Sequence, residues 1–188
     1  MTGLIVLDID ETMISSWICS HDEPDPENID DFDFSFEMPY RKDVYKVWIK
    51  KRPFLDQFLE YVISNFRIAV FTAADRVYAE EILRHLGILD KLEFFKSRES
   101  MTWGFGFPEL IVDLKRLSNI PGIDLKKTII IDDTKEVASR NRKNLLLVTK
   151  FDVRNPNSKH DATLLKVMSI LQTISDEPDW RVCNKRIN

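Results

Sequence analysis

The stretch LIVLDIDET, residues 4–12, runs four apolar residues directly into two aspartates that stand one residue apart. Three other apolar runs have strand length: RIAVF (67–71), TIII (128–131) and LLLV (145–148). Continuous apolar runs of this length are typical of strands that are buried on both faces of a parallel sheet.

Amphipathic helical patterns lie between or after these runs: RPFLDQFLEYVISNF (52–66), VYAEEILRHLG (77–87), PELIVDLKRL (108–117) and DATLLKVMSILQTI (161–174). In the first pattern one face collects five apolar residues, Phe54, Leu55, Phe58, Leu59 and Val62. Pro53 is expected in its first turn, and Gly87 is expected to cap the second helix. This alternation predicts an α/β fold, a doubly wound, Rossmann-like parallel sheet with helices on both faces.

Polar side chains follow three of the predicted strands. Asp8 comes after the first, Thr72 after the second and Asp132 after the third. Ligands of doubly wound sheets bind beyond the carboxyl ends of the strands. We therefore expect these three side chains to meet in one crevice.

Residues 18–51 do not fit the alternating scheme. FDFSFEMPY (32–40) alternates strictly and places Phe32, Phe34, Phe36, Met38 and Tyr40 on one side, as in a half-buried strand, and VYKVWI (44–49) follows. We interpret residues 18–51 as a small β flap inserted after the first strand. Its acidic start, with eight acids in residues 22–37, and its basic stretch in residues 41–52 are interpreted as solvated faces.

Length and composition favour one globular domain over residues 1–188, with a C-terminal helix at about 160–175. The chain is 44% hydrophobic and 31% charged, and its net charge of -4 gives no reason to expect a nucleic acid partner. No apolar stretch reaches the roughly 18 residues of a membrane span, and no signal or transit pattern is seen. A cytoplasmic or nuclear protein with reduced Cys19 and Cys183 is expected.

Paired aspartates, Asp8 with Asp10 and Asp132 with Asp133, are expected at the same end of the sheet. Four carboxylates at one place repel each other unless a cation balances them, and Mg²⁺ prefers such oxygen ligands. An aspartate beside Mg²⁺ can attack phosphorus, and a second carboxyl can protonate the leaving oxygen. A hydroxyl such as that of Thr72 could hold the phosphoryl oxygens.

The segment LDIDET resembles the D-x-D-x-T signature of haloacid dehalogenase superfamily phosphatases. VWIKKRPFLDQFLEYV, FRIAVFTAADRVYAEEIL, SRES and IIIDDT are similar to the branch of RNA polymerase II C-terminal-domain (small CTD, NLI-interacting factor-like) phosphatases. The resemblance implies a Mg²⁺-dependent protein serine/threonine phosphatase that forms an aspartyl-phosphate. Its partner would be a phosphoprotein, with a polymerase tail as one candidate.

The resemblance also implies residue roles. Asp8 matches the nucleophile, and Asp10 matches the general acid/base whose backbone carbonyl faces the metal. Thr12 completes the first motif, and Asp133 matches the direct metal ligand of the second pair. The expected groups are catalytic residues Asp8, Asp10, Thr72 and Lys115; substrate contacts Thr12, Arg98 and Tyr78; and metal ligands Asp8, Asp10, Asp132 and Asp133.

One position departs from the family pattern. The family has a lysine directly before the Asp-Leu of its third motif, and IVDLKRL places Val112 there. Lys115, three residues on, would share a helical face with that position and could reach the site, or could be a plain surface lysine. Lys96 and Arg98 are other candidate sources of positive charge.

Two other functions remain open: a small-metabolite phosphatase, and a phosphatase-like module that only binds a partner. The chain has no P-loop, because none of its five glycines precedes a lysine. The alternating aromatic residues of the flap are best interpreted as its inner face. The sharper alternative is that Phe36 and Met38 border a groove for apolar residues next to a phosphoserine.

Overall fold

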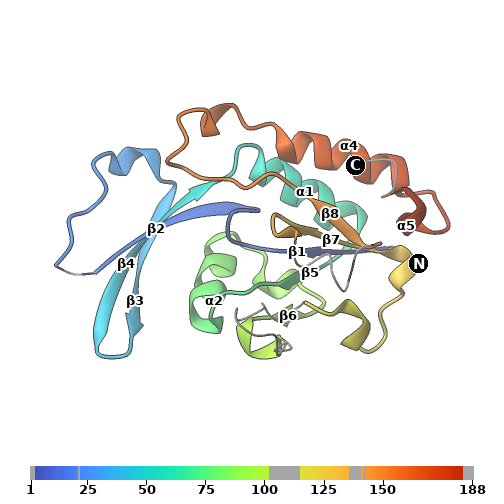
Figure 1. The fold of residues 1–188 in the computed structure, drawn as a ribbon, viewed down its shortest axis with the longest axis horizontal. Coiled ribbons are helices and arrows are strands. Elements are labelled where there is room, and N and C mark those ends of the chain that lie inside the picture. Colours follow the sequence, from blue (N-terminus) through green and yellow to red (C-terminus); the bar gives the residue numbers. More distant parts are fainter. Residues whose placement is uncertain (1–2, 21, 102–114, 136–140, 142, 184–188) are drawn as a thin grey trace, which may run out of the picture.

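The computed structural model describes residues 3–20, 22–101, 115–135, 141 and 143–183. Its centre is a five-stranded sheet with the strand order β6-β5-β1-β7-β8, and all neighbouring strands are parallel (Figure 1). The strands are β1 (Leu4–Leu7), β5 (Arg67–Phe71), β6 (Phe95–Lys96), β7 (Thr128–Asp132) and β8 (Leu145–Leu147). The predicted parallel sheet is confirmed. Only β6 lacks a sequence signal, because two residues are too few to show a period.

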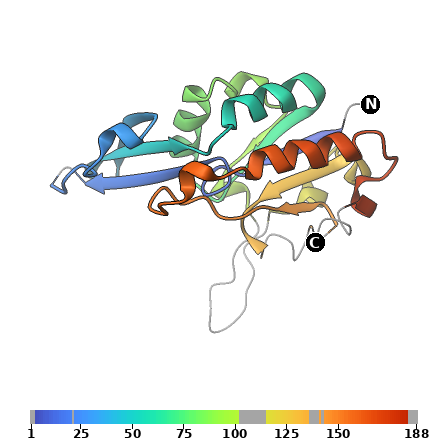
Figure 2. The ribbon, with the colours of Figure 1, turned by 90° about the horizontal axis from the view of Figure 1, so that it is seen from above.

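Residues of β1 alternate between two apolar cores. Ile5 and Leu7 belong to the larger core, together with buried residues of α1 (Leu55–Asn65), α2 (Arg76–His85) and α4 (Thr163–Ile174). Leu4 and Val6 belong to the smaller core on the other face, together with Leu117 and Ile130. Helix α4 packs along α1, as both ribbon views show (Figures 1 and 2). Both faces of β1 are therefore buried, as its continuous apolar run predicts.

Helix α1 begins later than its sequence pattern predicts. Pro53 lies in the turn before the helix, and Phe54 adopts the left-handed region with φ of 66°. The prediction placed Phe54 on the buried face of the helix. In the structure Phe54 lies outside the core and is 46% exposed. The other predicted apolar residues, Leu55, Phe58, Leu59 and Val62, are buried. Gly87 follows α2 with φ of 66°, as expected for a helix cap.

The flap is a three-stranded antiparallel sheet, one strand more than a hairpin. Its order is β2-β4-β3, with β2 (Ile14–Ser20), β3 (Phe34–Tyr40) and β4 (Asp43–Lys51). It therefore starts at Ile14 instead of residue 18. In Figure 1 it extends from the carboxyl end of β1 to the left of the central sheet.

Opposite charges of the flap pair with one another. Lys46 lies 2.9 Å from Asp25, and Lys50 lies 3.4 Å from Asp33. The acidic run and the basic stretch are thus partly neutralised within the flap and do not form two independent faces.

The remaining segments are short or lie near the C-terminus. The helix expected at about 160–175 is found as α4, which is slightly shorter than expected. Helix α5 (Trp180–Cys183) follows it. Most of the helix expected at 108–117 lies outside the described residues. The connections contain the 3-10 helices η1 (Ile29–Asp31), η2 (Leu89–Lys91), η3 (Arg98–Ser100), η4 (Leu117–Asn119), η5 (Leu125–Lys127) and η7 (Ser158–His160). None of the described helices is both long and apolar enough to cross a bilayer.

Candidate functional site

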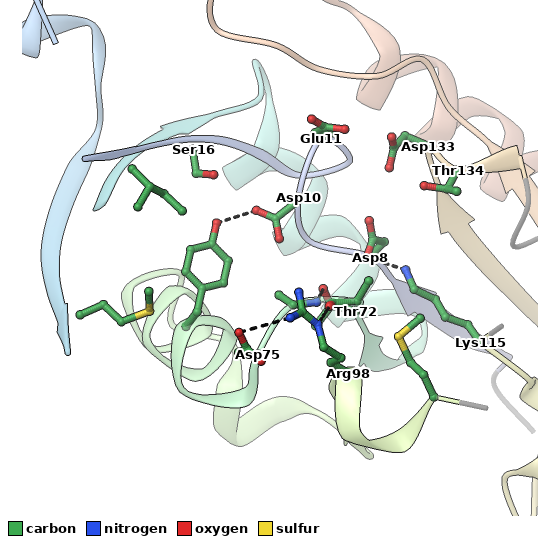
Figure 3. Close-up of a pocket in the computed structure, with 16 residues that line it drawn as sticks. Asp8, Asp10, Glu11, Ser16, Thr72, Asp75, Arg98, Lys115, Asp133 and Thr134 are labelled. Atoms are coloured by element: carbon green, nitrogen blue, oxygen red, sulfur yellow. Dashed lines mark hydrogen bonds and ion pairs between the residues drawn. The ribbon is translucent and has the colours of Figure 1, made fainter. Parts of the chain in front are cut away.

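The carboxyl ends of three central strands meet at one cavity. Asp8 follows β1, Thr72 follows β5, and Asp132 is the last residue of β7. A cavity of about 420 Å³ opens here and is lined by Asp8, Asp10, Thr72, Tyr78, Arg98, Lys115, Asp133 and flap residues (Figure 3). Asp132 lies just behind the wall, because its side chain is fully buried. The sheet thus brings together groups that are far apart in the sequence.

Thr12 joins the two aspartate motifs. Its hydroxyl lies 3.3 Å from Asp8 Oδ2 and 3.2 Å from Asp133 Oδ1, and it accepts a 3.1 Å hydrogen bond from the backbone N–H of Asp133. Thr12 is fully buried and does not line the cavity. In this structure the hydroxyl of Thr12 thus orients the two carboxylates, and the expected contact of Thr12 with substrate stays a prediction.

Lys115 is part of the site. Its Nζ lies 2.6 Å from Asp8 Oδ1 and 2.6 Å from Asp132 Oδ2, and only 2% of the residue is exposed. Burial disfavours its charge, but the two carboxylates outweigh that effect and raise the pKa of Lys115. Lys115 is therefore an ammonium ion between two aspartates, and not a surface lysine.

This position of Lys115 changes the interpretation of the third motif. Val112, where the family lysine is expected, lies outside the described residues. The argument from a shared helical face fails, because Lys115 itself lies in no helix. Lys115 therefore brings a positive charge next to Asp8 in this structure.

A group of three carboxylates is suited to a divalent cation. Oxygen atoms of Asp8, Asp132 and Asp133 all lie within 4.8 Å of one another. Burial, then the charge of Asp8, raises the pKa of Asp132 to about 6 although Lys115 acts against the rise. The same two causes raise the pKa of Asp133. Three carboxylates beside one ammonium leave a negative excess of two, which one Mg²⁺ ion would balance.

The carboxyl group of Asp10 binds Tyr78 and is not part of the cluster of three carboxylates. Its Oδ1 accepts a 2.5 Å hydrogen bond from the phenol of Tyr78 on α2 (Figure 3). Burial is the main cause that raises the pKa of Asp10 to about 7. The side chain of Asp10 does not belong to the cluster formed by the carboxylates of Asp8, Asp132 and Asp133. Metal binding by the backbone carbonyl of Asp10 stays a prediction. A carboxyl group with a pKa near 7 can both donate and accept a proton at neutral pH.

Thr72 and Arg98 lie on the side of the cavity formed by β5 and α2. Thr72 Oγ1 accepts a 3.1 Å bond from the backbone N–H of Ala74, which leaves its own proton for another acceptor. Arg98 Nε donates to the carbonyl of Ala73 at 2.8 Å, and Nη1 lies 3.5 Å from Asp75. Lys96, the other suggested cation, lines a separate small cavity with Arg116.

The flap forms one wall of the cavity. Ser16 and Ile18 of β2 and Met38 of β3 line the cavity. Phe36 does not line it but packs against Tyr78, with ring centroids 6.2 Å apart. The groove suggested for Phe36 and Met38 is therefore supported for Met38 alone. Ser16 and Ile18 were missed because the sequence gives no sign that β2 exists.

The sequence is similar to those of known phosphatases. The profile of the NLI interacting factor-like phosphatases matches residues 3–181. The putative CTD phosphatase-like protein 355R of invertebrate iridescent virus 3 is 30% identical over 183 residues, which cover 90% of this chain and 95% of the viral protein. The human carboxy-terminal domain RNA polymerase II polypeptide A small phosphatase 2 is 29% identical over 179 residues, which cover 93% of this chain and 58% of the human protein.

A solved structure supports the fold. The fission yeast RNA polymerase II CTD phosphatase Fcp1, bound to beryllium fluoride, aligns with a TM-score of 0.63 and 18% identity. The alignment covers 98% of this chain and 54% of that chain, so this chain spans about half of its length. The profile match over almost the whole sequence shows that the chain belongs to the NLI interacting factor-like phosphatase family, a branch of the haloacid dehalogenase type.

Proposed function

We propose that this chain is a Mg²⁺-dependent protein serine/threonine phosphatase that forms an aspartyl-phosphate on Asp8. The observation that carries the proposal is the contact of Lys115 with Asp8 and Asp132, at 2.6 Å each, on the wall of a cavity. A buried ammonium ion next to a nucleophilic carboxylate provides positive charge where a phosphoryl group would bind. Family membership supports the same chemistry.

In the first step the carboxylate of Asp8 attacks the phosphorus atom. The phosphorus–oxygen ester bond breaks, and the serine or threonine oxygen takes a proton from Asp10. Asp10 still holds this proton near neutral pH, because burial raises its pKa to about 7. Lys115 and the hydroxyl of Thr72 donate hydrogen bonds to the phosphoryl oxygens.

In the second step Asp10 acts as a base. As a carboxylate it removes a proton from a water molecule, which attacks the phosphorus of the aspartyl-phosphate. The products are inorganic phosphate and free Asp8, and Asp10 again carries its proton. The hydrogen bond from Tyr78 orients Asp10 in the resting site, where the two oxygen atoms are 2.5 Å apart.

Asp8 and Asp133 would hold Mg²⁺, with Asp132 beside them and the backbone carbonyl of Asp10 as a further ligand. The bound ion would balance the excess negative charge and polarise a phosphoryl oxygen. Thr12 contributes by fixing Asp8 and Asp133 relative to one another through its hydroxyl.

A phosphorylated segment of a protein is the proposed substrate. The cavity is lined by polar groups on the sheet side and by Ile18 and Met38 on the flap side, so a phosphate and an apolar neighbour could bind together. Several relatives are named for the polymerase C-terminal domain, which makes such a phosphoserine repeat the first peptide to test. A nuclear or cytoplasmic location is part of this proposal.

The test is phosphate release from a phosphoserine peptide with the polymerase-tail repeat and from a small aryl phosphate, each with and without Mg²⁺. Asp8→Asn is nearly isosteric but a poor nucleophile, so we expect it to lower the rate by about 10³-fold or more. Asp56→Asn, in an exposed ion pair with Lys51, is the matched control and should keep full activity.

Each outcome separates the candidate functions. Mg²⁺-dependent release from the peptide that disappears only in Asp8→Asn supports a protein phosphatase. Release from the aryl phosphate alone shifts the substrate towards other phosphoproteins or small metabolites. No release from either compound would favour a module that only binds a partner.

A further inference from the structure

Lys115 reaches the carboxylates from a segment without regular structure. Lys115 and Arg116 lie in no helix or strand, and η4 begins only at Leu117. A lysine side chain is flexible and loses rotamer entropy when it is fixed in one geometry. Contacts of 2.6 Å to both Asp8 and Asp132 therefore depend on the backbone from which the side chain extends.

The side chain of Asn141 holds this backbone on both sides of Arg116. Its Oδ1 accepts a 3.2 Å hydrogen bond from the N–H of Leu117, and its Nδ2 donates to the carbonyl oxygen of Lys115. Asn141 is 5% exposed, so neither bond is readily replaced by water. The asparagine lies 26 residues beyond Lys115 in the chain, and no local pattern links the two.

We propose that Asn141 is a positioning residue, which fixes the backbone of Lys115 and so holds its ammonium group between Asp8 and Asp132. Among the described residues the hydrogen bonds of the Asn141 side chain go to the backbone of Lys115 and Leu117 and not to Asp8 or Asp132, so Asn141 would act through Lys115. The inference rests on the proposed function, since a fixed cation matters for rate only if Lys115 assists phosphoryl transfer.

The chain offers a matched control in Asn144. It is also 5% exposed, and its Nδ2 donates to backbone carbonyls of Leu125 at 2.6 Å and Thr128 at 2.7 Å. It therefore makes bonds of the same kind, but these hold the start of β7 and not Lys115. Replacing either asparagine by alanine removes a buried amide, and only one replacement frees the lysine.

The first measurement compares wild type, Asn141→Ala and Asn144→Ala at a temperature where all are folded. With a small aryl phosphate, we expect Asn141→Ala to lower kcat about 10- to 100-fold, since small displacements of catalytic groups have effects of that size. Inhibition by inorganic phosphate should weaken in the same variant. Asn144→Ala should lower the melting temperature by a similar amount but leave kcat and phosphate inhibition near wild type.

The second measurement does not depend on activity. Acylation by acetic anhydride, located by mass spectrometry, should increase at Lys115 in Asn141→Ala, while the exposed Lys166 on α4 reacts equally in all variants. If Asn141→Ala does not fold, Asn141→Asp keeps the acceptor for Leu117 and replaces only the donor to Lys115. It should show the same two effects.

Equal losses of kcat in the Asn141 and Asn144 variants, with Lys115 no more reactive than in wild type, would overturn the inference. If wild type releases no phosphate from any substrate, the proposed function fails instead. The acylation of Lys115 in the Asn141 variants then decides this inference alone.

Discussion

The pKa of Asp10 depends in part on the hydrogen bond from the phenol of Tyr78. Burial raises the pKa of Asp10 to about 7, while the hydrogen bond from Tyr78 acts in the opposite direction and lowers it. Tyr78→Phe removes that bond and should raise the pKa of Asp10 further. Because the first step of the proposed reaction needs protonated Asp10, kcat/KM should fall as pH rises through this pKa. We expect the falling limb to move to higher pH in Tyr78→Phe, as measured with the aryl phosphate.

The control for this prediction is Tyr61→Phe. Tyr61 lies on α1 and packs against Phe66, with ring centroids 5.9 Å apart, and does not line the cavity. Its pH profile should match that of wild type. A Tyr78→Phe profile that also matches wild type would show that the phenol does not act on Asp10.

At the level of single residues, the sequence predicts the groups that directly follow strands. Asp8, Thr72 and Asp132 could be placed at one edge of the sheet because parallel strands end together. The role of Thr12 could not, because a hydroxyl at this spacing can face substrate or the chain interior. Lys115 was ambiguous, since a long side chain reaches its partners along a backbone path that spacing does not define.

Several elements meet at the guanidinium group of Arg52, which follows β4. It donates to the carbonyl of Thr12 at 3.0 Å, to that of Thr149 at 2.7 Å and to Asp161 Oδ2 at 2.8 Å. Asp161 in turn accepts a bond from the N–H of Thr163 at the start of α4. Arg52 is 1% exposed, so the loop after β1, the end of β8 and α4 share one buried cation.

Arg52→Ala should therefore destabilise the protein strongly. It takes the guanidinium partner from Asp161 and from two carbonyl groups, and breaking an ion pair that is buried on both sides costs about 3 to 5 kcal/mol of unfolding free energy, which is the upper range for this largely buried pair. Arg52→Lys keeps the charge but lacks the planar fork, so a smaller loss is expected. Denaturant unfolding, followed by circular dichroism, measures both.

Arg67→Ala is the matched control, because Arg67 pairs with Glu93 at 3.0 Å on the surface. Exposed pairs of this kind contribute about 0 to 1 kcal/mol. If Arg52→Ala and Arg67→Ala lowered the free energy of unfolding equally, the role given to the buried guanidinium group of Arg52 would be contradicted.

Elements with a long, clear period could be predicted best. β1 and β5 have the predicted bounds, and α4 lies within its predicted range, because each buries a continuous face or stripe. β2 and β6 could not be predicted. β6 has two residues, and β2 (ISSWICS) shows neither a continuous apolar run nor a strict alternation, since part of it borders the cavity instead of a core.

The whole molecule places strong negative charge in one partly buried site. The central sheet brings Asp8, Asp132 and Asp133 together, and Lys115 neutralises only part of this charge. The folded protein thus carries a repulsion that the unfolded chain lacks, and a cation that binds only the folded state should relieve it. Stability and binding of the proposed Mg²⁺ ion should therefore be linked in this fold.

We expect Mg²⁺ to raise the free energy of unfolding, by about 2.7 kcal/mol at a concentration about 100 times its Kd. Asp133→Asn should lose most of this gain. Without metal, the same variant should be more stable than wild type at neutral pH, because burial and Asp8 raise the folded pKa of Asp133 above its ordinary 3.8. The charged carboxylate of Asp133 therefore lowers the stability of the folded protein, and it does so only at pH values where Asp133 is ionised.

The sign of the effect sets its pH range. Asp133 in the unfolded chain binds a proton only near and below pH 3.8, whereas the folded protein binds it at higher pH. Wild type should therefore lose stability relative to Asp133→Asn as pH rises from about 4 towards neutral, and the two should converge in acid. Thermal unfolding of both proteins in EDTA and in Mg²⁺, at several pH values, tests this. Equal stabilisation of both by Mg²⁺ would remove Asp133 from the metal site, because the ion would then bind without it.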